Sequence, residues 1–300
     1  MPDHRVALFF CNLGNGVRNT GIDAIVIGTG FGVIACAIEC KECCPGCDSE
    51  RSPINGHRAL LHEVRFEHAK DLGIEIRMGH QAVEYWEDEA SGKASVKSQT
   101  GESFDADIIV AADGAMNLAR KLVIHGEFIC TFFSYCSPLV GKDMHCLASS
   151  SLGGKGIAWF THKFSSPGEI EDVDWGPRCA AVILKAPSCI DWKLLVHDPL
   201  PTWVRKSGPV ALIGDAAHPF LPSSAQGASQ AIEDGVTLAF TLNLAGKDNV
   251  LLSTRTWESI RYVKYSDFQK MRNITSASHC TGTNGCVMHS DKWHGAKAGD

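Results

Sequence analysis

The sequence predicts an α/β fold, because apolar strand segments end at glycine-containing turns that lead into helices. Three segments carry this pattern: Ala24 to Gly28, Asp107 to Gly114, and Val210 to Gly214. In the first, a short apolar run enters a turn with three glycines and continues into the helical segment Ile34 to Ile38. A strand, turn and helix in this order make up the first unit of a dinucleotide-binding domain.

The glycines of this first turn have separate expected roles. Gly28 permits the tight turn, and Gly30 lets a pyrophosphate approach the backbone. The third glycine of the fingerprint is expected at position 33, but this chain has Val33 there and Gly32 one residue earlier. Since the third glycine allows close packing of helix against strand, we expect Val33 to displace or strain the helix, at a cost on the order of 1–3 kcal/mol.

The most informative segment reads VALIGDAAHPFLPSSAQGASQAIEDG and begins at Val210. A buried strand ends at Gly214 and Asp215, a proline-containing loop follows, and a helix opens near Gly227. The first backbone N–H groups of that helix lack intrahelical acceptors and lie at the positive end of its dipole, which favours an anion or an electron-rich ring edge. A carboxylate at the preceding strand end suits a ligand that carries both hydroxyls and negative charge.

This segment, from Leu200 to Gly235, resembles the second flavin-contacting motif of the FAD-dependent aromatic-ring hydroxylases, the salicylate-hydroxylase-like group of flavoprotein monooxygenases. The resemblance implies that Asp215 binds the ribityl chain of FAD. It also implies that a loop lies beside the isoalloxazine ring and is formed by Pro222, Gln226 and Gly227. The alternative is an ordinary strand–loop–helix in which the aspartate caps the helix.

His218 lies within the same segment. It is a candidate for an acid–base or orienting group, although a histidine directly after a strand is more often structural.

Two further segments resemble motifs of the same family, in the family's order. Asp113 and Gly114 begin a match to Asp-Gly-x-x-Ser-x-x-Arg, which implies a place near the FAD pyrophosphate and the nicotinamide cofactor. Asn117 replaces the serine and can also cap a helix, and Arg120 is expected to offer a fork of donors to a phosphate. The segment at Arg58 resembles a helix start of the family, which implies that this arginine reaches the FAD phosphates. Surface arginines without a ligand are the alternative.

The resemblance implies a Rossmann-like FAD-binding domain of the three-layer GR2 type with a β-sheet substrate domain. We expect the FAD-binding domain to be discontinuous, over residues 22–125 and 201–272, and to flank a shortened β-rich substrate domain at 126–200. The ends, 1–21 and 273–300, are expected to be loosely ordered.

Other elements follow from apolar periodicity. Helices are expected at 57–72, Ala228–Ala245 and Trp257–Arg272. Strands are expected at Ile74–Met78, Ala82–Trp86, Ala94–Ser98, Phe128–Phe133, Ile157–Phe160 and Ala180–Leu184.

The chain departs from the family pattern between its first helix and Arg58. No apolar run lies there, so the second strand of the dinucleotide-binding unit is missing, together with the acid that binds the adenosine ribose. Glu39 and Glu42 come too early in the chain, and Glu50 follows no strand. In addition, only 102 positions separate Asp113 from Asp215, which is short for the family's substrate domain. The chain therefore resembles a family member with internal deletions.

Two functions remain open from the sequence. The resemblance implies an FAD-dependent monooxygenase that uses NADPH or NADH and molecular oxygen to hydroxylate or epoxidise a small organic substrate, aromatic or isoprenoid, in secondary metabolism. The alternative is a truncated, non-catalytic homologue that serves as a binding or scaffold protein or has no activity. The sequence identifies neither the substrate nor the oligomeric state.

Composition narrows the class of protein. The 300 residues carry a net charge of −6 without a basic stripe, which disfavours nucleic-acid binding. The longest apolar stretch, from Ala24 to Ile38, is interrupted by glycines and is too short to span a membrane. Val6 to Cys11 is too short for a signal peptide.

Thirteen cysteines, several of them in apolar runs (Cys36, Cys130 and Cys179), indicate buried thiols in a reducing compartment, so we expect a cytoplasmic protein. One group approaches zinc-ligand spacing: Cys40, Cys43, Cys44, Cys47, His57 and His62. The interval between the last cysteine and the first histidine is shorter than in a usual zinc finger, and we expect no metal there.

Overall fold

The computed structural model describes residues 6–14, 19–42, 58–88, 91–124, 144–151, 156–163, 181, 199–220 and 226–279. Its centre is a five-stranded sheet with the order β10-β7-β2-β1-β3. The strands are β1 (Ala7–Gly14), β2 (Asn19–Ile27), β3 (Glu75–Met78), β7 (Ile108–Ala111) and β10 (Val210–Leu212).

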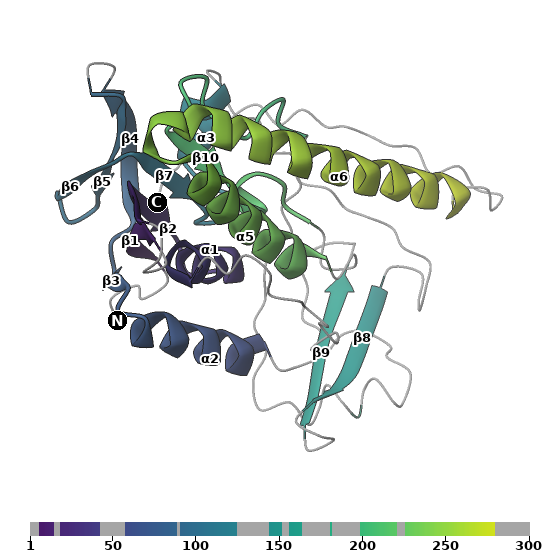
Figure 1. Ribbon diagram of the computed structural model, residues 1–300. Helices are drawn as coiled ribbons and strands as arrows, with labels where there is room; N and C mark the ends of the chain where they lie inside the picture. The colour runs from purple at the N-terminus through teal and green to yellow at the C-terminus, as the bar shows by residue number, and fades with distance from the viewer. Residues whose placement is uncertain are drawn as a thin grey trace, which may run out of the picture.

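The three strands expected to carry the site lie next to one another and are parallel. β7 pairs with β2 on one side and with β10 on the other. Their apolar residues are buried on both faces, as expected for central parallel strands. The longer of the described helices are α1 (Phe31–Glu42), α2 (Arg58–Asp71), α5 (Gly227–Ala245) and α6 (Val250–His279), of which α5 packs between α1 and α6 (Figure 1). The expected α/β fold is confirmed.

The expectation of a loosely ordered segment at 1–21 was wrong for the residues described there. β1 pairs antiparallel with β2 and also with β3, and thus occupies an internal position of the sheet. Leu8, Phe9 and Leu13 are fully buried. An apolar run of this length is stabilised by burial on both faces, at roughly 1.5–3 kcal/mol per large side chain. The position that β1 fills is the one in which a dinucleotide-binding unit has its second parallel strand.

Small residues bring α1 and α5 close together. A Cβ atom on Gly32 would lie 2.8 Å from the carbonyl oxygen of Ala231, and one on Gly235 would lie 2.5 Å from the carbonyl oxygen of Gly32. Gly32, offset by one from the fingerprint position, thus serves close packing between two helices. Val33 is fully buried within the core, and the displacement or strain expected from it stays a prediction.

The remaining elements largely match the sequence. A second sheet contains β4 (Ala82–Asp88), β5 (Lys93–Ser98) and β6 (Ser103–Ala106), and α3 (Ala119–Ile124) follows β7. β8 (Met144–Ser151) and β9 (Gly156–Lys163) form a hairpin, and β9 includes the expected strand Ile157–Phe160.

Two expected strands fall largely outside the described residues: Phe128–Phe133 lies wholly outside, and of Ala180–Leu184 only residue 181 is described. α6 is helical as far as His279, so the loosely ordered end expected from residue 273 was wrong over its first residues. Within the described chain, no helix is both long and apolar enough to cross a membrane.

Candidate functional site

Three turns expected from the sequence meet at one edge of the sheet. The register places Ile27 opposite Ala111 and Ala111 opposite Leu212, so β2, β7 and β10 end side by side. The turns that follow carry Gly28, Asp113 with Gly114, and Gly214 with Asp215. In open α/β sheets, ligands bind at this carboxyl edge of the strands.

The glycines at this edge have the properties that a close ligand requires. Gly28 has φ of +126°, and a Cβ atom there would lie 2.6 Å from the carbonyl oxygen of Ala112, so only glycine fits between the first two turns. Gly30 and Gly114, in contrast, face open space, since a Cβ on either would meet no atom within 4 Å. The backbone at these two residues is therefore accessible to a ligand beside the start of α1.

Asp215 lies in η3 (Gly214–Ala216), the short 3-10 turn after β10, and is an exposed residue of that turn. Its carboxylate is nevertheless surrounded by enough protein that desolvation raises its pKa above the ordinary value. The charges of His218, Arg58 and Arg120 and the backbone N–H of Phe220 oppose that rise. Three basic residues expected at the site thus act electrostatically on Asp215, the residue expected to bind the ribityl chain.

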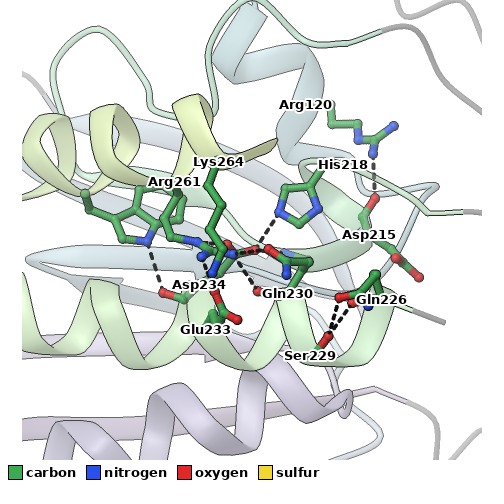
Figure 2. Close-up of polar contacts among 12 residues, drawn as sticks. Arg120, Asp215, His218, Gln226, Ser229, Gln230, Glu233, Asp234, Arg261 and Lys264 are labelled. Atoms are coloured by element: carbon green, nitrogen blue, oxygen red, sulfur yellow. Dashed lines mark hydrogen bonds and ion pairs between the residues drawn. The ribbon is translucent and has the colours of Figure 1, made fainter. Parts of the chain in front are cut away.

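Arg120 is fully buried and contacts the backbone of this turn. Its Nη2 donates to the carbonyl oxygen of Asp215 at 2.6 Å (Figure 2). Its Nε donates to the carbonyl oxygen of Ala216. A buried guanidinium with two donors on one turn fixes the position of that turn. The contact to a phosphate that the resemblance implied stays a prediction, while the observed contacts make Arg120 a positioning residue.

Asp234 joins the turn after β10 to α6, and its side chain is fully buried. One oxygen, Oδ2, accepts the backbone N–H of Gly214 at 2.9 Å and lies 2.6 Å from Nε2 of His218. The other, Oδ1, accepts Nε of Arg261 at 2.7 Å (Figure 2). Burial would raise the pKa of Asp234, but His218, Arg261 and the Gly214 N–H outweigh it and hold the pKa below its ordinary value.

His218 is part of this buried framework. Its side chain is 2% exposed, and its ring lies 4.7 Å from Trp203, 5.1 Å from Tyr265 and 5.4 Å from Phe220 between ring centroids. Its Nδ1 is buried and has no hydrogen-bond partner among the residues that the structure describes. Packing of this kind favours a structural histidine that holds the loop against α5, rather than an acid–base group in contact with substrate.

The loop residues expected beside the flavin ring are placed in part. Gln226 is the N-cap residue of α5 and Gly227 its first residue, and Ser229 Oγ donates to the Gln226 carbonyl oxygen at 2.9 Å. The helix therefore opens at the expected residue, with its N-terminus near the turn after β10. Pro222 lies outside the described residues.

Asp113 has an unusual environment. Burial raises its pKa to about 6, although its own backbone N–H and the charge of Arg120 lower it. The side-chain amide of Asn117 donates to Asp113, and the Asn117 oxygen accepts the backbone N–H of Ala119 at 2.6 Å. Asn117 thus caps α3 as the sequence suggested, and it also orients the carboxylate.

Comparisons with known proteins agree with this arrangement. Residues 202–258 match the family model of an FAD binding domain. Asperlicin C monooxygenase from Petromyces alliaceus is 35% identical over 261 residues, which takes in 71% of this chain and 56% of that protein. The chain belongs to the FAD-binding monooxygenase family.

Solved structures show the same fold. A crystal structure of CtdE in complex with FAD and substrate 4 superposes with a TM-score of 0.64 at 28% identity, covering 71% of this chain and 63% of CtdE. A salicylate hydroxylase substrate complex, at 23% identity and a TM-score of 0.54, shares the fold. The chain thus covers less than two thirds of the length of these proteins.

The alignment with Asperlicin C monooxygenase also contains positions that are absent here. It runs over 261 residues but takes in 71% of a 300-residue chain, so part of the relative has no counterpart in this chain. This agrees with the internal deletions inferred from the sequence.

The described residues fit one half of FAD better than the other. Open backbone at Gly30, the charge of Arg58 and the carboxylate of Asp215 suit a phosphate and a ribityl chain at the sheet edge. On the adenosine side, β1 occupies the place of the strand that carries the ribose-binding acid. His62, which the sequence suggested only as a histidine at zinc spacing, lies here, with Nε2 2.5 Å from the Thr29 carbonyl oxygen.

Among the described residues, no group of three or more histidine, cysteine or acidic side chains is arranged to hold a metal ion. Cys11, Cys36 and Cys40 are buried, free thiols, and the pKa of Cys40 lies above its ordinary value, chiefly because its thiol is hydrogen-bonded with Cys11 and Cys36 and also because it is buried. Cys36 is therefore buried as expected, whereas Cys130 and Cys179 lie outside the described residues, as do Cys43, Cys44 and Cys47.

A hollow of about 270 Å³ lies at the opposite end of β10. Its lining includes Glu87, Lys93, Ser207 and Pro209, and Pro209 directly precedes the strand. The hollow is therefore separate from the edge that carries Gly28 and Asp215.

Proposed function

We propose that this protein is an FAD-dependent monooxygenase that uses NADPH or NADH and molecular oxygen to hydroxylate or epoxidise a small organic substrate, aromatic or isoprenoid, in secondary metabolism. The observation that carries this proposal is the meeting of Gly28, Asp113 and Asp215 at the carboxyl ends of three adjacent parallel strands. Family membership and the monooxygenases among its relatives support it.

The chain's own residues would bind and orient the cofactor. When bound, FAD supplies the redox chemistry by which reducing equivalents and oxygen are used. Asp215 would accept hydrogen bonds from ribityl hydroxyls, and the N-terminus of α1 beside Gly30 would receive a phosphate. Asp234 and Arg120 would hold the turn that presents Asp215, through the Gly214 N–H and the Asp215 carbonyl oxygen.

The buried thiols support a reducing compartment, and a cytoplasmic location is part of the proposal.

A second function is favoured by the replacement of the acid-bearing strand by β1. A site that lacks the adenosine contacts binds FAD weakly, and the protein would then be a non-catalytic homologue that acts as a binding or scaffold protein.

The first measurement that separates the two functions is the absorbance spectrum of the purified full chain. We expect a bound flavin with its visible absorption bands, either as purified or after FAD is added and excess removed. Consumption of NADPH or NADH that depends on bound flavin and oxygen would then support the enzyme. A folded protein that retains no flavin at high FAD concentration would contradict the monooxygenase proposal.

Asp215→Ala should weaken FAD binding by about tenfold or more. Hydrogen bonds to a charged acceptor contribute roughly 1.5–3 kcal/mol, and 1.4 kcal/mol corresponds to a factor of ten in affinity. The fold should be unaffected, because the exposed carboxylate is not part of the core. The measurement is the Kd from quenching of flavin fluorescence.

Asp248→Ala is the matched control for that measurement, because it removes the same charge from an exposed residue in η5 (Lys247–Asn249), beyond the far end of α5. It should leave the Kd unchanged. Equal affinities of wild type and Asp215→Ala, with both proteins folded, would show that this carboxylate does not contact the cofactor.

A further inference from the structure

β2 lies between β7 and β1 in the sheet, and the neighbour on the β1 side runs in the wrong direction for the recognition of adenosine. In a dinucleotide-binding unit this neighbour is parallel, and its carboxyl end delivers an acid to the ribose. Here the neighbour is β1, which is antiparallel, with Leu8 opposite Ile27. The sheet edge that binds ligand therefore meets the start of β1, and the residues at that point are Val6 and Ala7.

These two residues cannot replace the missing acid. Both side chains are apolar, and both backbone carbonyls already accept hydrogen bonds: Ala7 from the Gly28 N–H at 2.9 Å and Val6 from the Gly79 N–H at 2.8 Å. The last acid of α1, Glu42, lies at the far end of that helix and pairs with His68 at 3.2 Å. Among the described strand ends next to Gly28, none brings a carboxylate to the position of the ribose.

His62 also occupies part of the adenosine side of the site. It reaches from α2 to the glycine turn, where Nε2 lies 2.5 Å from the carbonyl oxygen of Thr29. Its ring packs edge-to-face on Phe31 with centroids 5.7 Å apart and stacks on Phe66. One polar group of the turn is thus already satisfied by the protein, and apolar rings lie beside it.

The phosphate and ribityl side retains its contacts. α1 is a twelve-residue helix whose N-terminus follows Gly30, and the backbone there faces open space. Arg58, exposed at the start of α2, is close enough to lower the pKa of Asp215 by its charge. A terminal phosphate would therefore meet a helix dipole and a cation, while a ribityl chain would meet a carboxylate.

We propose that this site holds a flavin through its isoalloxazine ring, ribityl chain and first phosphate, so that FMN binds about as tightly as FAD. The inference rests on the proposed function, since it concerns the cofactor of the same site. FMN and FAD share every contact named on the ribityl and phosphate side. Among the described residues, none is placed to give the adenosine of FAD the ribose hydrogen bonds on which this fold's preference for a dinucleotide depends.

The test is a set of binding titrations with the full chain after removal of any bound flavin. Dissociation constants for FAD, FMN and riboflavin come from flavin fluorescence, and ADP is added as a competitor against FMN. We expect the constants for FAD and FMN to agree within about threefold, riboflavin to bind at least about tenfold more weakly, and ADP not to displace FMN. FAD binding more than about tenfold tighter than FMN, or displacement of FMN by ADP, would overturn the inference.

Arg58→Ala provides a second readout. It should weaken FAD and FMN by the same factor and leave riboflavin unchanged, because the proposal assigns this charge to the phosphate that the first two share. A loss confined to FAD would contradict the inference by placing the arginine on the adenosine side. Selective binding of FAD would leave the monooxygenase proposal standing, whereas a folded protein that binds none of the three flavins would overturn that proposal and this inference together.

Discussion

Asp234→Asn should lower the free energy of unfolding by about 3–5 kcal/mol, because it removes one partner of a buried ion pair and leaves the other charge without compensation. The carboxylate is fully buried and serves Arg261, His218 and the Gly214 N–H at once. An amide has one acceptor oxygen, so it cannot serve the guanidinium on one side and the histidine and backbone on the other. Urea-induced unfolding, followed by tryptophan fluorescence, measures the change.

Glu233→Gln is the matched control for this variant. Glu233 also pairs with Arg261, at 2.6 Å, and with Lys264, but its side chain is 40% exposed. Exposed ion pairs contribute about 0–1 kcal/mol, so this variant should lose at most about that amount. Comparable losses in the two variants would show that burial of Asp234 is not what makes its pair important.

The lowered pKa of Asp234 also predicts that its contacts with Gly214, His218 and Arg261 lose their stabilising effect in acid. Its folded pKa lies below its unfolded value, so its contribution to stability is fully present above the unfolded pKa and is lost as the pH falls through the folded one.

Asp113→Asn should make the protein more stable than wild type near neutral pH, by up to about 3 kcal/mol. Burial raises the folded pKa of Asp113 to about 6 from an ordinary 3.8, so the folded state holds the proton more tightly than the unfolded state does. The free energy of unfolding of wild type therefore falls as the pH rises from about 4 to about 6, and stays lower above that range. The amide is permanently neutral and avoids this cost.

The measurement is the free energy of unfolding of both proteins between pH 4 and pH 8. The two curves should meet near pH 4 and separate as the pH passes 6, while Asn117 keeps an oxygen at position 113 to which it can donate. A constant difference at every pH would mean that the titration of Asp113 is not its cause. Weaker flavin binding by the same variant would indicate that the stability cost is retained for a functional carboxylate.

Much of the fold could be predicted from local patterns. The strand from Val210 and the helix to Ala245 were expected almost to the residue, because an apolar run, a glycine turn and a terminal Gly246 are local signals. The glycine at position 28 was likewise interpretable, since its positive φ and its contact with Ala112 belong to the turn itself.

Features that depend on distant partners could not be predicted in the same way. β1 was missed as an ordered strand, because its stability comes from pairing with β2 and β3. The residues from Val6 to Cys11 carry no local signal that identifies these two strands as partners. Arg120 matched a motif, yet its donors turn to carbonyls nearly a hundred positions later in the chain. The contacts of Asp234 with Gly214, His218 and Arg261 were not predicted. Their signal in the sequence is an acidic residue inside an apolar helix, which indicates a buried counter-charge.

The antiparallel pairing of β1 with β2 also bears on how the chain folds. A parallel neighbour for β2 must be reached through a crossover of a dozen residues or more, whereas β1 and β2 are separated in sequence only by residues 15–18. Contacts between neighbours in sequence cost less loop-closure entropy, and chains rich in them fold faster. β1 and β2 can therefore pair before the more distant strands β7 and β10 are available, because both precede those strands in the chain and so emerge before them during synthesis.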